Sequence, residues 1–75
     1  MNNEQLNILA NEFGFVFPRH QNTATRRTGA GTIIVNRWTD ERFSVTFQAR
    51  PGRRGQVWKA TNFDGVLEHL VRLIP

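Results

Sequence analysis

Basic side chains are the groups in this sequence best suited to chemistry, and nine of the ten lie between residues 19 and 59. Eight of those nine are arginine, whose planar fork matches the oxygens of phosphate and carboxylate groups. Only Asp40 and Glu41 oppose them in that segment, whereas the whole 75-residue chain has a net charge of +4. Such a concentration of positive charge is typical of proteins that bind polyanions, and it indicates phosphate binding rather than catalysis. The nine residues are Arg19, Arg26, Arg27, Arg37, Arg42, Arg50, Arg53, Arg54 and Lys59.

Three arginines, Arg50, Arg53 and Arg54, lie in and beside a predicted hairpin tip at residues 50–55. The tip reads RPGRRG, in which proline fixes one φ angle and the first glycine permits a positive φ, so a tight turn is expected. Arginines at such a tip could hold phosphates through paired hydrogen bonds. The alternative is a solvated turn whose charge serves solubility.

A second basic hairpin carries Arg26 and Arg27 ahead of a glycine-rich turn at residues 29–31. In an up-and-down sheet this turn lies at the same end as the 50–55 tip, and the turn at 39–41 lies at the other end. We therefore expect a basic end and a mildly acidic end. The predicted binding residues are Arg26, Arg27, Arg50, Arg53 and Arg54, flanked by Arg37, Lys59 and the aromatic Trp38.

Trp38 matters because tryptophan on an open sheet face can stack on nucleobases. A three-residue turn at 39–41 pairs Arg37 with Phe43 and turns Trp38 outward; a turn of two or four residues would reverse the faces and bury a polar Asn. We favour the first arrangement, because a buried amide needs partners. The second tryptophan, Trp58, is expected to pair with Phe47, a predicted core residue, and to face inward.

Catalytic and metal-binding patterns are not found. His20 and His69 stand alone in the sequence and are expected at the surface, four of the six acids are spread over predicted helices, and the chain has no cysteine. A metal site needs three or four ligands, and a general base needs an orienting partner. We therefore expect no enzyme activity, no catalytic residue, no metal, no cofactor and no small-molecule substrate.

Segments with helical periodicity and segments with strand-like alternation follow one another along the chain. A helix is predicted over residues 3–13, capped by one of the first two asparagines and ended by Gly14. A short extended stretch is expected at residues 15–17, and strands are predicted at 23–28, 32–38, 43–50 and 56–60. A final helix begins at Thr61, whose spacing to Asp64 suits a capping box. Its apolar stripe comprises Phe63, Val66, Leu67, Leu70, Val71 and Ile74.

These elements predict an α+β fold formed by residues 1–75 as a single domain. It is a two-layer sandwich with a three- to four-stranded antiparallel β-meander, flanked by an N-terminal and a C-terminal helix in the order α-β-β-β-α. Both helices are expected on one sheet face, which leaves the other face open. The order of elements resembles that of double-stranded-RNA-binding domains. Those domains have a basic motif where this chain reads Thr61-Asn62-Phe63-Asp64, so the resemblance is limited to topology.

The N-terminal sequence lacks the pattern of a signal peptide and no run is long enough to span a bilayer, so a soluble, cytoplasmic protein without a membrane partner is expected. Two function classes fit. The first is a small nucleic-acid-binding or accessory domain that contacts the phosphate backbone of DNA or RNA without strong sequence specificity. The second is a phage- or plasmid-type inhibitor, similar to anti-CRISPR proteins, that covers an acidic protein surface of a larger host or defence assembly.

Overall fold

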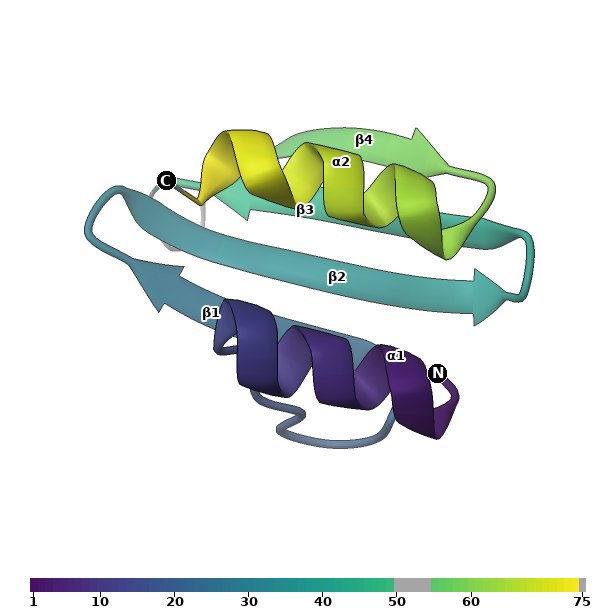
Figure 1. Cartoon of the computed structure of the whole chain (residues 1–75). Helices are drawn as coiled ribbons and strands as arrows, with labels where there is room; N and C mark the ends of the chain where they lie inside the picture. Colours follow the sequence, from purple (N-terminus) through teal and green to yellow (C-terminus); the bar gives the residue numbers. More distant parts are fainter. Residues whose placement is uncertain (50–54, 75) are drawn as a thin grey trace.

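The sheet is a four-stranded antiparallel meander in which neighbours in sequence are neighbours in space (Figure 1). The computed structural model describes residues 1–49 and 55–74. The expected α+β class is confirmed, and the sheet has four strands, the larger of the two predicted numbers. The strands are β1 (Thr23–Thr28), β2 (Gly31–Thr39), β3 (Arg42–Gln48) and β4 (Gln56–Ala60).

The N-terminal helix has the predicted extent but not a uniform geometry. It begins as α1 (Asn3–Asn7) and continues as a π-helical segment η1 (Ile8–Glu12). Asn2 caps it: its side chain accepts from the backbone N–H of Gln5, and the Gln5 side chain accepts from the Asn2 N–H, which completes a capping box. Gly14 follows with a φ of +71°, a left-handed conformation that favours glycine and ends the helix.

The C-terminal helix, α2 (Phe63–Leu73), is capped one residue later than predicted. The side chain of Asn62, not Thr61, accepts a 2.8 Å hydrogen bond from the Gly65 N–H. The apolar stripe buries Val66 and Leu70 completely. Val71, expected in that stripe, is instead 63% exposed, and Leu73 packs against the core.

Both helices cover the same face of the sheet, as expected (Figure 1). Alternation along the strands therefore sends every second side chain into the core. Ile33, Val35 and Val45 have no exposed surface, and Phe47, expected to be a core residue, is only partly buried at the core's edge. The buried hydrophobic core comprises Met1, Leu9, Phe15, Ala24, Ile33, Val35, Phe43, Val45, Val66 and Leu70.

The strand register decides which side chains reach the uncovered face. Arg37 pairs with Phe43, as predicted, but the predicted three-residue turn is wrong: Thr39 pairs with Arg42 across a two-residue turn. A β-bulge between Arg37 and Thr39 supplies the extra residue and keeps the predicted faces. Trp58 pairs with Val45, so its expected pairing with Phe47 is wrong by two residues. A shift of two preserves the alternation, and Trp58 still faces the helices.

The two edges of the sheet differ. Beside β1, Val16 forms an isolated antiparallel bridge with Thr25, in the short stretch expected to be extended. Within the described residues β4 has a partner strand on one side only. Neither helix in residues 1–49 and 55–74 has the length and apolar character that crossing a membrane requires.

Candidate nucleic-acid interface

Charge is divided between the two layers of the fold. The four strands contain no acidic residue, and their bases are Arg26, Arg27, Arg37, Arg42 and Lys59. The helices contain four acids and one base, namely Glu4, Glu12, Asp64, Glu68 and Arg72. Because both helices lie on one side of the sheet, the acids are carried by the helical layer and the bases by the sheet.

Three of the strand cations point away from the helices. Register and alternation place Arg27 on β1, Arg42 on β3 and Lys59 on β4 on the uncovered face, and all three side chains are exposed. Of these, Arg42 was not among the predicted binding residues, although its position before the inward Phe43 could have indicated it. The outward strand positions between the cations are mainly small or uncharged: Thr25, Thr32, Ile34, Asn36, Ser44, Thr46 and Gln48.

Arg26 points the opposite way from Arg27 and is occupied within the fold. Its Nη1 donates a 2.8 Å hydrogen bond to the backbone carbonyl of Phe13, at the end of the N-terminal helix. Carbonyls in a last helical turn lack partners within the helix, and a cation there interacts favourably with the helix dipole. The structure therefore gives Arg26 a role in holding the helix end to β1.

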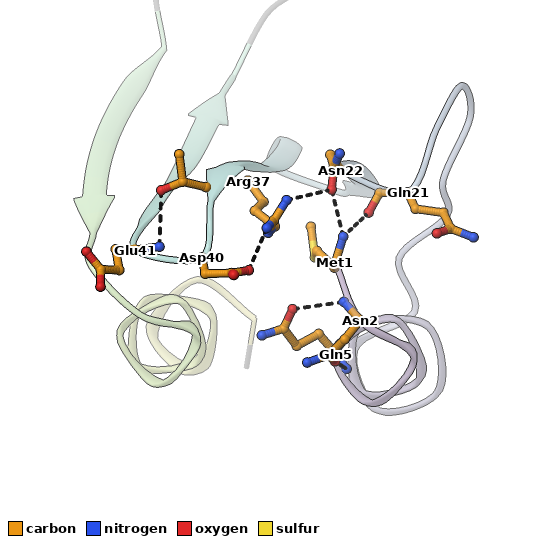
Figure 2. A network of polar contacts seen from close by, with 9 residues as sticks. Met1, Asn2, Gln5, Gln21, Asn22, Arg37, Asp40 and Glu41 are labelled. Carbon is orange, nitrogen blue, oxygen red and sulfur yellow. Dashed lines mark hydrogen bonds and ion pairs between the residues drawn. The ribbon is translucent and has the colours of Figure 1, made fainter.

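Arg37 is also occupied within the fold. It donates to the side chains of Asn22 and Asp40, and the α-amino group of Met1 donates to the Asn22 Oδ1 and to the backbone carbonyl of Gln21 (Figure 2). These bonds tie β2, the turn after it and the loop before β1 to the start of α1. Arg26 and Arg37 thus face the helices rather than the uncovered surface.

Two pKa values reflect this network. The hydrogen bond from Arg37, followed by its positive charge, holds the pKa of the Asp40 carboxyl below its ordinary value. Partial burial lowers the pKa of the Met1 α-amino group, and the charge of Arg37 lowers it further, against the opposing effect of Asp40. Asp40 is therefore an ionised partner of Arg37 at neutral pH.

Trp38 lies outward, as predicted, and is 62% exposed. It borders a hollow of about 340 Å³ on the uncovered face, at the end of the sheet near the 40–41 turn. The lining residues are Trp38, Glu41, Arg42, Phe43, Ser44, Val57, Lys59, Ala60 and Thr61. Sequence reasoning identified Trp38 and Lys59 but not Val57, Ser44 or Arg42. This end of the sheet, expected to be mildly acidic, also brings together two outward cations.

The histidines differ in their surroundings. His69 was expected to be a surface residue, but it is half-buried and its ring stacks on Trp58, with centroids 5.7 Å apart and planes 27° apart. The prediction for His69 was wrong because α2 lies near the edge of the sheet, where a flanking helical position meets β4. His20 is exposed, and its Nδ1 accepts a hydrogen bond from the Asn22 N–H.

Arg50, Arg53 and Arg54, the predicted hairpin-tip residues, lie outside the described residues. The strands leading to them are placed: Gln48 at the end of β3 pairs with Thr32, and β4 begins at Gln56. This end of the sheet also holds the turn between β1 and β2, as expected.

Comparison with known proteins gives no relative from which a function could be transferred: no family model, curated protein or solved structure matches the chain. Among residues 1–49 and 55–74, no three histidine or acidic side chains gather closely enough to hold a metal ion. Inference about function therefore rests on the distribution of charge and of exposed aromatic side chains.

Proposed function

We propose that this protein binds nucleic acid through the uncovered face of its sheet, contacting the phosphate backbone without strong sequence specificity. The observation that carries the proposal is the division of charge: strands without acids, and helices with four acids and one base. A face that presents Arg27, Arg42 and Lys59 with mainly uncharged neighbours attracts polyanions, and the acidic helical layer favours an approach from the other side.

Sequence-specific reading is not part of the proposal. Specific recognition of duplex DNA commonly uses a helix in the major groove, with cations directed to base edges and phosphates. Both helices of this protein carry net negative charge and cover the core face. Threonine hydroxyls and amide groups on the sheet add hydrogen-bonding capacity to phosphate and sugar oxygens.

Salt dependence provides the test. Each phosphate neutralised contributes about −0.7 (single strand) to −0.9 (duplex) to the slope of log affinity against log salt. Three outward cations therefore predict a slope of about −2 or steeper, or a loss of roughly 20-fold in affinity between about 50 and 200 mM salt. Any contact made by Arg50, Arg53 or Arg54 steepens the slope further.

The matched variants compare the two layers. In a titration of fluorescein-labelled oligonucleotides followed by anisotropy, Arg27→Ala combined with Lys59→Ala should flatten the slope by about 1.4 to 1.8. Arg72→Ala removes one cation from the helical layer and should leave both affinity and slope unchanged. An absence of binding to both DNA and RNA at the lower salt, or an Arg72→Ala variant as weak as the double variant, would contradict the proposal.

A protein-binding inhibitor is the second candidate, and the exposed apolar side chains favour it. Trp38 and Val57 are 62% and 57% exposed on the same face, and Val57 belongs to β4, which has a partner strand on one side only within residues 1–49 and 55–74. Tryptophan and arginine are also enriched where protein interfaces derive most of their binding energy. This candidate predicts a specific partner in a pull-down at physiological salt, with no binding of nucleic acid at low salt.

A further inference from the structure

We infer that the hollow beside Trp38 receives one unstacked base of a single strand, so that the preferred ligand of this face is single-stranded nucleic acid. This inference rests on the proposed function, and it names the ligand that the same surface selects. Three features carry it: the exposure of Trp38, the shape of the hollow, and the position of the cations at its rim.

The exposure of Trp38 has no explanation in the packing of the fold. The other tryptophan, Trp58, faces the helices, is half-buried and stacks on His69. Trp38 leaves most of its indole in water on the face that no helix covers. A flat aromatic ring on a polar, cationic surface is the platform on which proteins stack unpaired bases.

The hollow is lined by outward side chains of three adjacent strands. Trp38 from β2, Ser44 from β3 and Val57 from β4 belong to its lining, and Ser44 itself is buried. The volume of the hollow, about 340 Å³, lies near the lower limit for small-molecule sites, roughly 300–1,000 Å³. A site of this size suits a single base held against the indole rather than a base pair.

The rim of the hollow is charged in a way that orients a nucleotide. Lys59 pairs with Ser44 in the β3–β4 register, and Arg42 lies two residues before Ser44 on the same outward side of β3. The turn residue Glu41 adds one carboxylate to the lining, so the two cations outnumber it. The one ion pair found in residues 1–49 and 55–74 joins Arg37 to an acid of the turn, so neither rim cation has a carboxylate partner there. The phosphate is therefore drawn to Lys59 and Arg42, and the base faces Trp38.

A single strand also fits the distribution of cations across the sheet. Lys59 and Arg27 lie at opposite corners of the uncovered face. By the register, three inter-strand spacings separate them across the sheet and four residues separate them along the strands. Strand spacings of about 4.8 Å and residue rises of about 3.4 Å place their Cα atoms roughly 20 Å apart. A short flexible strand can follow this diagonal while turning one base into the hollow. In a duplex the bases remain paired and stacked, and none is free to enter.

The experiment compares three fluorescein-labelled probes of equal length: an oligothymidylate, a blunt DNA duplex, and an abasic oligonucleotide that has the same phosphates without bases. We expect wild-type protein to bind oligothymidylate most tightly. Trp38→Ala should weaken that binding about 5- to 150-fold, the range for the loss of one stacked base, with the salt slope unchanged. Binding of the abasic probe should not change. Trp38→Phe, which keeps an aromatic face, should restore most of the lost affinity.

Fluorescence supplies a second measurement. The chain has two tryptophans, so Trp58→Phe leaves Trp38 as the single indole, and oligothymidylate should quench its emission. Thermal unfolding of each variant establishes that it is folded. Equal binding of all three probes, together with a Trp38→Ala variant that binds like wild type, would overturn the inference while leaving phosphate binding intact. Failure of wild-type protein to bind any probe would instead remove the proposed function itself.

Discussion

Arg26 and Arg27 are adjacent in β1 but point to opposite faces of the sheet. Replacing one should therefore affect stability, and replacing the other should affect binding. Arg26 donates its 2.8 Å hydrogen bond to the carbonyl of Phe13, whereas Arg27 is exposed on the uncovered face. We expect Arg26→Ala to lower stability without a direct effect on binding, and Arg27→Ala to weaken binding without an effect on stability.

The size of the Arg26 effect follows from its bond. A hydrogen bond to a charged group contributes about 1.5–3 kcal/mol, and the partial exposure of Arg26 reduces that to about 1–2 kcal/mol. In a domain of this length each kcal/mol moves the melting temperature by roughly 4–8 °C. Arg26→Ala should therefore melt about 4–15 °C below wild type.

Arg27→Ala removes an exposed charge from a surface position. Such substitutions change the free energy of unfolding by less than about 0.5 kcal/mol, so its melting curve should overlay that of wild type. Its salt slope for oligonucleotide binding should decrease by about 0.7 to 0.9, the contribution of one phosphate contact.

Circular dichroism melting curves and anisotropy titrations, run on the same preparations, measure both quantities. The binding titrations must be performed well below the melting temperature of Arg26→Ala, so that both variants are fully folded. If Arg27→Ala destabilises the protein as much as Arg26→Ala does, or if Arg26→Ala alone changes the salt slope, then the assignment of these side chains to opposite faces is incorrect.

Three further variants test the fold. A Cβ at Gly31, where φ is +156°, would lie 2.4 Å from a backbone oxygen of β3. Gly31→Ala should therefore lower the free energy of unfolding, measured by denaturant titration, by at least about 2 kcal/mol. The control is Gly29→Ala, where a Cβ meets nothing within 4 Å, and its free energy of unfolding should stay within about 0.5 kcal/mol of wild type. Leu70→Ala removes a side chain with no exposed surface and should cost about 2–5 kcal/mol, and a wild-type melting curve would contradict its place in the core. Asp40→Asn removes the charge that Arg37 binds; because the pKa of Asp40 is lowered by folding, its contribution is present above the ordinary carboxyl pKa and is lost as the pH falls through the lowered value. The melting temperatures of Asp40→Asn and wild type should therefore differ slightly at neutral pH and converge in strong acid, and a constant difference would count against the ion pair.

Periodicity was sufficient to predict the layers of this fold. Alternation in β3 and the spacing of Val66 and Leu70 each indicate one apolar face, and the only economical way to cover both is a two-layer structure. Trp38 was correctly predicted to lie outward, but from a three-residue turn; the structure has a two-residue turn and a β-bulge between Arg37 and Thr39, which keep the same faces. Trp58 was placed on the correct face with the wrong partner, because the facing of side chains survives a two-residue shift but the register does not.

The roles of the individual arginines were not predictable. The sequence shows which side chains carry positive charge and can bind anions. It does not show which of them will instead form a hydrogen bond or ion pair with a backbone carbonyl or an aspartate of the same chain. Arg26 and Arg37 are engaged in this way, because the end of the N-terminal helix and the turn after β2 lie within their reach. The hollow beside Trp38 was not predictable either, since its lining combines side chains from three strands.

Under the proposed function, the outward cations Arg27, Arg42 and Lys59 serve an external ligand rather than the fold. Acids at Glu4 and Asp64 lie in the first turns of their helices, where the helix dipole stabilises negative charge. The outward cations have no comparable role: they face water and have no carboxylate partner among the described residues. Uncharged polar residues occupy neighbouring positions of the same face, as Thr25 and Thr46 do, so the sheet does not require charge there. Like charges on one face repel one another, and a bound polyanion would turn that repulsion into attraction.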